Sequence, residues 1–221
     1  MNGIIQGGIT IEKNKKIRII ILVIAIVAIA IGTAAYVFSD YVTIDLYLTG
    51  ENATVNTLSF QVGKDIPKME EEILNYSIHQ MNNVDSDISS IKSGIREIAE
   101  SYGFNNVNVN IKSQFGENQL PMSVLVDGIS MVPTLKDGEL IIIEKTNDIK
   151  VGDIIVAKDP EYGLLIKRVG IISGNNIFLA SDNNDTVTVV ENGVPTSMIA
   201  IEKWTNKTNV VGIARIFNVN E

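Results

Sequence analysis

The chain has 221 residues, of which 45% are hydrophobic, so it is long enough for one core with additions or for two small cores. It contains no Cys and a single His, which excludes a disulfide framework, a thiolate zinc site, a cysteine nucleophile and a metal site built from several histidines. The net charge is −8, and this acidic balance argues against nucleic acid as a partner, because phosphate binding needs a basic face.

The N-terminal region predicts a membrane anchor. Residues 19–38 form an uncharged, almost wholly apolar run of 20 residues, which as a helix spans the ~30 Å hydrocarbon layer of a bilayer. Residues 1–18 carry a net charge of +3, so the positive-inside rule predicts a cytoplasmic basic tail, a single transmembrane anchor over 19–38 and an extracytoplasmic body. The alternatives are a cleaved signal peptide, for which the run is long, and a buried core helix.

Residues 39–120 predict a small α/β module. Its expected strands and helices, in chain order, are Val42–Leu48, Asn52–Val62, Asp65–Gln80, Ser86–Tyr102 and Val107–Ile111. The strands follow from β-branched or alternating patterns, and the helices follow from apolar residues at helical spacing. This module carries no catalytic motif, and His79 within it matches no triad by spacing or context. Its expected role is packing or contact with a partner, such as a secretion channel or an accessory protein.

From residue 121 to residue 221 the pattern changes to short β-branched runs between Gly, Asp and Pro residues. These runs are Val124–Val126, Leu140–Ile143, Asp153–Ala157, Leu164–Val169, Ile177–Ala180, Val187–Val190 and Val210–Ile216. Their spacing predicts an all-β, barrel-like domain. The expected fold class of the chain is therefore mainly β, with an N-terminal transmembrane helix and the small α/β module.

The segment Asp127–Leu135 follows the first of these runs and contains a candidate nucleophile, Ser130. Gly128 lets the backbone approach a ligand closely, and Pro133 favours a turn. A serine at the exit of a strand, with backbone N–H groups free beside it, can attack a carbonyl group and stabilise the oxyanion that forms. A serine in a turn is usually only a turn residue, so the assignment depends on other segments of the chain.

Lys167 is a charged residue within the apolar run Leu164–Val169. A lysine at its reference pKa of ~10.4 is a poor base at neutral pH. Burial among Leu165, Ile166 and Val169 would disfavour the ammonium form and lower the pKa of Lys167. The alternative is a lysine at a strand edge whose charged head reaches water, and without the serine segment this alternative would be preferred.

Five segments in this order resemble the type I signal peptidases, which share a fold with self-cleaving LexA-like repressors. They are Ser130-Met131-Val132-Pro133, Gly152-Asp153-Ile154-Ile155-Val156, Ile166-Lys167-Arg168-Val169, Asp182-Asn183-Asn184 and Val211-Gly212-Ile213-Ala214. The resemblance covers Val124–Ala214 and the anchor, but not residues 50–120. It implies that Ser130 is the nucleophile and Lys167 its general base, and that no metal or organic cofactor is needed.

The resemblance also implies roles for the remaining site residues. The residues Gly128, Ile129, Ser130 and Met131 would lie beside the substrate strand and the oxyanion. Some bacterial members carry a hydroxyl residue where this chain has Gly128, so the oxyanion would rest on the Ser130 N–H. Asp182 or Asp185 takes the later acidic position, where a structural or lysine-orienting role and simple turn formation are both open.

The implied substrates are preprotein signal peptides with small side chains one and three residues before the cut. Such a peptide would add as a strand beside Val124–Ile129 at the outer face of the lipid bilayer. The short interval between Ser130 and Lys167 is similar to that of archaeal and endoplasmic-reticulum members, which usually carry His in place of this lysine. The chain therefore combines a compact layout with the bacterial type of base.

Three other functions compete with this interpretation. A self-cleaving repressor would carry a DNA-binding helix-turn-helix and an Ala-Gly or Cys-Gly cut site, whereas this chain has an anchor and neither dipeptide. A membrane-tethered envelope protein with an inactive peptidase fold would bind without turnover. A Ser/Lys peptidase that processes another membrane substrate would use the same two residues.

Overall fold

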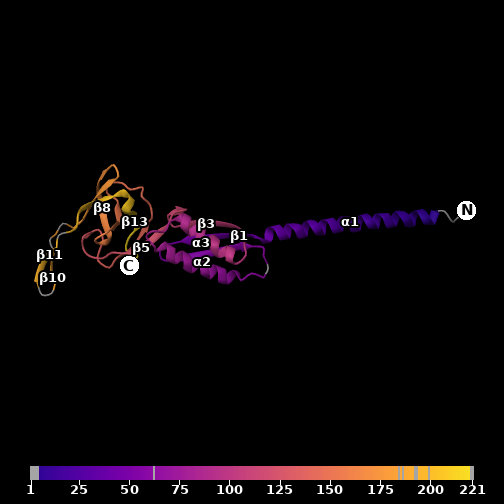
Figure 1. The fold of residues 1–221 in the computed structure, drawn as a ribbon, viewed down its shortest axis with the longest axis horizontal. Coiled ribbons are helices and arrows are strands. Elements are labelled where there is room, and N and C mark those ends of the chain that lie inside the picture. The colour runs from indigo at the N-terminus through magenta and orange to yellow at the C-terminus, as the bar shows by residue number, and fades with distance from the viewer. Residues whose placement is uncertain are drawn as a thin grey trace.

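The computed structural model describes residues 5–61, 63–183, 185, 187–191, 194–198 and 200–219. Val62 of the predicted second strand and Asn184 of the acidic loop lie outside these residues. Along its longest axis the molecule has a long N-terminal helix at one end, an α/β region in the middle and a curled sheet at the other end (Figure 1).

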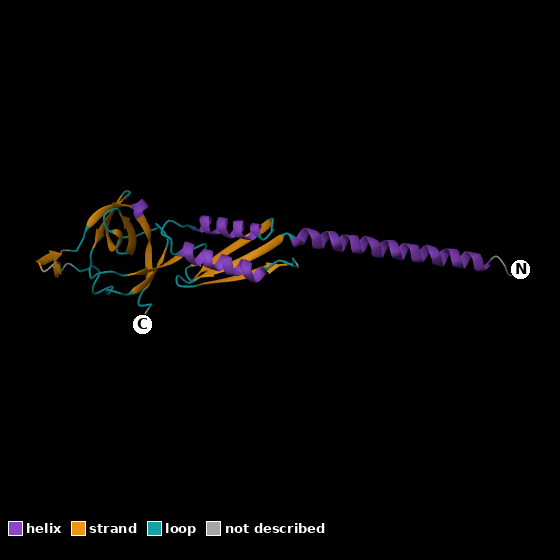
Figure 2. Cartoon of the chain, turned by 60° about the horizontal axis from the view of Figure 1, so that its bottom comes forward, coloured by secondary structure: helices purple, strands orange, loops and turns teal. Residues whose placement is uncertain are grey.

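The N-terminal helix α1 (Ile5–Ser39) begins within the basic tail and so is longer than the predicted anchor. Its segment Lys15–Ala34 has a mean hydropathy of 2.8 and is long and apolar enough to cross a membrane. The described apolar side chains of this segment are exposed, because none of the other described residues packs against them. Two views show α1 leading away from the rest of the chain (Figures 1 and 2).

The middle region, residues 40–118, is called the module here. Its sheet has the order β2-β1-β3-β4, with the strands β1 (Tyr41–Leu48), β2 (Ala53–Ser59), β3 (Asn106–Ser113) and β4 (Gly116–Glu117). The two helices are α2 (Ile66–Met81) and α3 (Ile88–Ser101). Alternate residues of β1 are buried and pack with apolar residues of both helices in one cluster, so the helices cover one face of the sheet.

Both module helices begin close to where their sequence predicts. Asp65 caps α2 by accepting a hydrogen bond from the Lys68 N–H, and Asp87 forms a capping box with Ser90 at the start of α3. The predicted strands are also present, and they pair into one sheet because β3 lies parallel to β1 with β2 on the other side. The two-residue strand β4 is too short for a sequence pattern to indicate.

The curled sheet is a seven-stranded antiparallel half-barrel with the order β12-β9-β8-β7-β13-β6-β5. Its strands are β5 (Pro121–Leu125), β6 (Leu140–Glu144), β7 (Ile154–Asp159), β8 (Gly163–Ser173), β9 (Asn176–Ala180), β12 (Lys203–Asn206) and β13 (Val210–Ile216). Both faces of its central strands are buried, in two separate clusters, because Ile154 and Val156 belong to one and Ile155 and Ala157 to the other. The sheet leaves β5 and β12 as its two edges.

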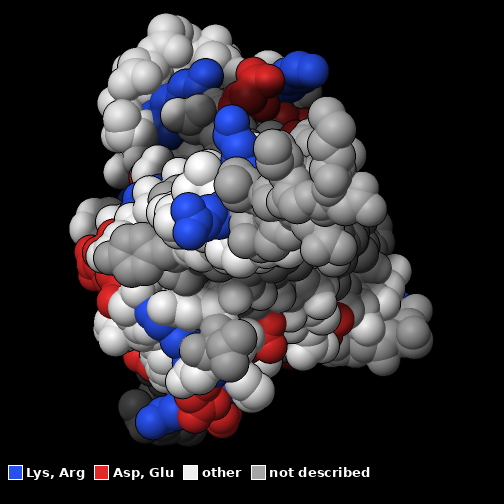
Figure 3. Space-filling view, turned by 90° about the vertical axis from the view of Figure 1, so that its right-hand side faces the viewer, with Lys and Arg blue, Asp and Glu red and all other residues white. Residues whose placement is uncertain are grey.

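A separate hairpin, β10 (Val187–Glu191) with β11 (Val194–Met198), projects from the half-barrel (Figure 1). The predicted run at Val187–Val190 is thus a strand, but it pairs only within this hairpin among the described strands. On the face that looks along α1, the described acidic and basic side chains are interspersed (Figure 3).

Candidate active site

The loop between β5 and β6 holds Ser130 at the surface of the half-barrel. Met131 is 1% exposed and Leu135 is fully buried, so the residues on the C-terminal side of the serine are anchored in the core cluster that includes Val124 and Ile141. The Val132 N–H donates to the Ile129 carbonyl, and the Leu135 N–H donates to the Met131 carbonyl. The serine therefore sits in a turn whose flanks are fixed by packing and by backbone hydrogen bonds.

Lys167 comes from β8, and its Nζ lies 2.5 Å from the Ser130 Oγ, at hydrogen-bond distance. The side chain is only 3% exposed, and Leu165 and Val169 beside it in the strand belong to a buried cluster. Burial lowers the pKa of Lys167, while the carboxylates of Glu202 and Asp182 oppose this by raising it. The balance favours a lysine that gives up its proton more readily than a lysine in water.

Asn183 ties the serine loop to the segment after β9. Its backbone N–H donates to the Ser130 carbonyl at 2.9 Å, and its side-chain amide donates to the Ile129 carbonyl at 3.1 Å. Both bonds hold carbonyl groups of the serine loop toward Asn183, which sets the direction of the peptide groups around the nucleophile. Sequence reasoning gave this asparagine no role, because an amide in an Asp/Asn-rich loop most often serves its own turn.

Asp182 makes a two-point ion pair with Arg168. The Arg168 Nε donates to one carboxylate oxygen at 2.7 Å and its NH2 donates to the other at 2.5 Å, while the Thr134 hydroxyl donates to the second oxygen at 2.5 Å. These bonds, led by the one from Arg168, lower the pKa of Asp182. The aspartate thus links β8 to the far end of the serine loop, whereas Asp185 is exposed and bonds through its N–H to Asn183.

The four predicted oxyanion and substrate-strand residues are not equivalent in the structure. The Gly128 N–H already donates to Asp137, which removes it as a donor to a ligand. Ile129 is 41% exposed, and Met131 is buried. Among the described residues the Ser130 N–H donates no hydrogen bond, so this donor is available to an oxyanion.

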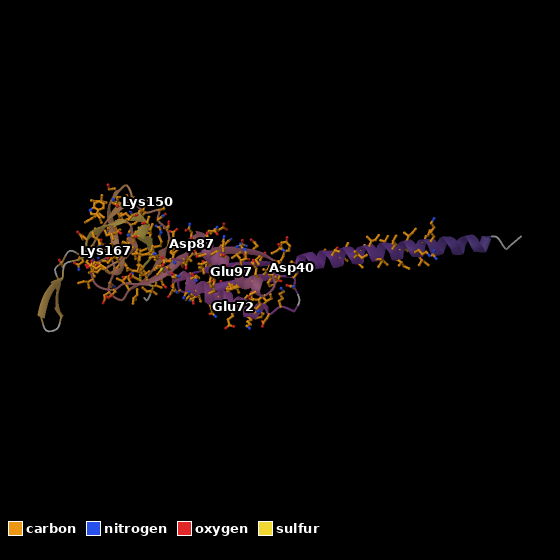
Figure 4. All side chains as sticks on the ribbon, viewed as in Figure 1. Asp40, Glu72, Asp87, Glu97, Lys150 and Lys167 are labelled. Atoms are coloured by element: carbon orange, nitrogen blue, oxygen red, sulfur yellow. The ribbon has the colours of Figure 1, made fainter. Side chains whose placement is uncertain are left out.

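A hollow of about 130 Å³ opens beside the two residues and is called the cleft here. Its walls come from the edge strand β5 with the start of the serine loop, and from the segment Leu164–Lys167 of β8. Leu125 and Leu164 are 62% and 40% exposed at this cleft, which gives its rim apolar contacts. Figure 4 places Lys167 in the half-barrel, with the labelled module residues between it and α1.

Two other features lie away from this cleft. His79 is exposed on α2 in the module, so a histidine triad with Ser130 has no support in the geometry. A larger hollow of about 530 Å³ lies on the module and is lined by polar residues such as Asp45, Asn56 and Asn110. The cleft is smaller, but it combines a hydroxyl group with a buried amine. We therefore take the cleft, and not the larger hollow, as the candidate active site.

An antiparallel half-barrel with a serine hydroxyl against a buried lysine defines the Ser/Lys peptidase fold. The chain belongs to the Peptidase S24-like family, whose model matches residues 88–199, just over half of the 221-residue chain. This family is shared by LexA-like repressors and signal peptidase I, so the relationship expected from the sequence is confirmed. No curated protein matches the chain.

The family match begins at the first residue of α3 and therefore includes part of the module. It ends before β12 and β13, which complete the half-barrel. The predicted division of the chain at residues 120 and 121 remains a prediction, since the match crosses it.

Proposed function

We propose that this protein is a membrane-anchored serine endopeptidase that cleaves signal peptides from preproteins with Ser130 as nucleophile and Lys167 as general base. The observation that carries the proposal is the distance of 2.5 Å between Ser130 Oγ and the Nζ of a lysine that is 3% exposed. Burial lowers the pKa of this lysine, and a general base that acts near neutral pH needs such a lowered pKa.

The reaction follows from this pair. Neutral Lys167 takes the hydroxyl proton while Ser130 Oγ bonds to the carbonyl carbon of the scissile peptide, and the carbonyl oxygen becomes an oxyanion beside the Ser130 N–H. The ammonium group of Lys167 then gives its proton to the leaving nitrogen as the C–N bond breaks. Water, deprotonated by Lys167, attacks the acyl-serine ester, and the returning proton restores the serine.

Substrate binding is supported by the edge of the half-barrel. β5 pairs with β6 on one side only, so the backbone groups on its other side can accept an extended peptide as an added strand. The peptide would run past Leu125 toward Ser130, with its side chains against the narrow cleft. A hollow of about 130 Å³ suits small side chains, which agrees with the substrates of the family that the sequence resembles.

The test is cleavage of a preprotein by the full-length protein in detergent micelles, with wild type and Ser130→Ala compared. Ser173, exposed in β8, provides the matched control as Ser173→Ala. We expect cleavage by wild type and by Ser173→Ala and no cleavage by Ser130→Ala. Preprotein binding of equal strength by wild type and Ser130→Ala, with no turnover by either, would instead support the membrane-tethered binding module.

A further inference from the structure

The path of the chain through the module determines where the cleft stands relative to α1. β1 begins at Tyr41, directly after α1 and Asp40, and ends at Leu48. Just beyond that end, Gly50 packs against Ile142 of the half-barrel so closely that a Cβ on it would lie 2.6 Å from an Ile142 side-chain carbon. The strand β1 therefore crosses the module from the membrane helix to the half-barrel.

The strand β3 and the loop between α2 and α3 show the same end-to-end arrangement. β3 is parallel to β1, so it begins next to Asp40, where the Asn106 N–H donates to the Asp40 carbonyl, and ends toward the half-barrel. The loop between α2 and α3 lies at the half-barrel end, where Lys145 donates to the Asn83 carbonyl at 2.5 Å and Lys158 forms an ion pair with Asp85. The module is thus placed end to end between α1 and the half-barrel.

Both ends of the module are tied to their neighbours. At the α1 end, Asp40 accepts hydrogen bonds from the Asn106 N–H and from the Asn105 side chain at 3.2 Å, so no free linker separates the helix from the sheet. At the other end, which we call the joint, the loop 82–87 and Gly50 contact the half-barrel, and Val84 packs against its core. These contacts resist folding of the half-barrel back toward the bilayer.

The surface of the module near α1 carries exposed apolar side chains. Leu58 and Phe60 are 63% and 71% exposed, and the register of β2 places them at the end where Val42 pairs with Ser59. Apolar and aromatic side chains next to the C-terminal end of α1 fit the interface of a bilayer that α1 crosses. Contact of this end with the membrane would place the half-barrel, and the cleft in it, at the end of the module away from the bilayer (Figure 1).

The distance follows from strand geometry. The eight residues of β1 span about 26 Å at ~3.3 Å per residue. The cleft lies farther still, because β5 starts at the joint with Pro121 and the loop that carries Ser130 leaves from its other end. In Figure 4 the labelled residues run in the order Asp40, Glu97, Asp87 and Lys167 along the long axis.

We propose that the module is a spacer that holds the Ser130–Lys167 cleft more than one module length outside the bilayer, so that the protein cuts those membrane-tethered preproteins whose cleavage site lies about ten or more residues beyond the apolar segment of the signal peptide. This inference rests on the proposed function. A scissile bond only about four residues from the apolar segment reaches at most ~14 Å when fully extended, which is short of the cleft.

The experiment uses membrane-tethered reporters in proteoliposomes together with the full-length protein. Each reporter has one transmembrane helix, a Gly/Ser spacer of 4, 8, 16 or 24 residues and then the same cleavage sequence with small residues one and three positions before the cut. The same cleavage sequence as a soluble peptide reports the activity of the cleft without any tether, and Ser130→Ala reports the background.

We expect the initial cleavage rate to be at least tenfold lower for the spacer of 4 residues than for the spacer of 16, with the soluble peptide cleaved. A rate that is highest at 4 residues, or equal for all spacers, would overturn the spacer role while leaving the peptidase intact. Failure of Ser130-dependent cleavage with the soluble peptide and every reporter would overturn the proposed function, and the spacer role with it.

Discussion

Two regions of this protein, the cleft and the joint, each contain a lysine whose pKa is lowered by burial. In the cleft Lys167 Nζ lies 2.5 Å from the Ser130 hydroxyl oxygen. At the joint Lys145 Nζ donates to the carbonyl oxygens of Asn83 at 2.5 Å and Ser86 at 3.4 Å. Burial lowers the pKa of Lys145 to about 8, with Asp85 and Asp87 opposing and Lys158 assisting.

The difference between the two regions lies in the partner of the amine. A hydroxyl group can give its proton to a neutral amine and become a nucleophile, whereas a carbonyl oxygen has no proton to give. Lys145 therefore has a lowered pKa without a chemical role and serves to bind the loop 82–87 to the half-barrel. A shifted pKa alone does not identify a catalytic lysine, and the group within hydrogen-bond distance decides the role.

The sharpest test of this comparison is the pair Lys167→Met and Lys145→Met. Each replaces an amine by an apolar side chain of similar length, so packing changes little. We expect Lys167→Met to lose about 10³-fold or more in kcat/KM, because members of a catalytic pair fail together. Lys145→Met should stay within about threefold of wild type, since Lys145 lies at the joint. Initial rates on a soluble peptide measure both.

Equal loss of activity in two variants that both remain folded would show that the group at hydrogen-bond distance does not decide which lysine serves the reaction. Thermal unfolding provides the control, because a folded Lys167→Met with no activity separates catalysis from stability. Lys167→Ala should behave like Lys167→Met in activity.

The second test is the pH dependence of kcat/KM. Lys167 acts as a base only when neutral, and burial lowers its pKa, so the rate should rise with pH through this lowered value and be low in acid. Lys145→Met should leave the profile unchanged, whereas Lys167→Arg should be inactive at every pH because guanidinium stays charged. A kcat/KM that stays constant from about pH 5 to pH 9 would contradict the role of Lys167, because a lysine whose pKa lies below its reference value of ~10.4 should change its protonation within this range.

The same measurement can be sharpened with Lys167→His. Imidazole has a reference pKa of ~6.5, so any residual activity should show its rising limb near that value. A limb at the wild-type position would assign the titration to another group.

A smaller effect is expected from Asn183→Ala. This change removes the amide that donates to the Ile129 carbonyl but leaves the backbone bond to Ser130. The serine loop should lose part of its orientation, with kcat falling about tenfold and KM changing less, because misplacement affects the reacting geometry. The control is Asn175→Ala, because Asn175 is exposed in the turn between β8 and β9 and its side chain donates to Asn206 of β12, away from the cleft. Equal kinetics for the two variants would show that Asn183 has no positioning role.

The last prediction concerns stability at the joint and not activity. The pKa of Lys145 is about 8 in the folded protein and ~10.4 in the unfolded chain, so the unfolded state binds more protons between these values. Stability should therefore rise with pH from about 8 to ~10.4 in wild type relative to Lys145→Met. Urea unfolding midpoints at pH 7.5 and pH 10 measure the difference. A midpoint difference that does not change with pH would mean that Lys145 keeps its proton in the folded state.

The sequence by itself determined the elements that rest on local patterns. The apolar run 19–38 lies within α1, because hydropathy needs no tertiary partner to be recognised. The module helices were predicted from the helical spacing of their apolar residues, and the central strands of the half-barrel from their β-branched runs. Ser130 and Lys167 were singled out through a family resemblance, since a serine in a turn or a lysine in a strand is by itself ambiguous.

Tertiary structure decided what depends on residues far apart in the chain. β12 contains a Lys, a Trp, a Thr and an Asn without apolar alternation, and it is a strand because β9 offers it backbone partners. The pairing of Ser130 with Lys167, the bonds from Asn183 and the charge of Glu202 near the amine all arise from contacts across the sheet. The end-to-end placement of the module likewise depends on strand direction and on the joint, which no local propensity encodes.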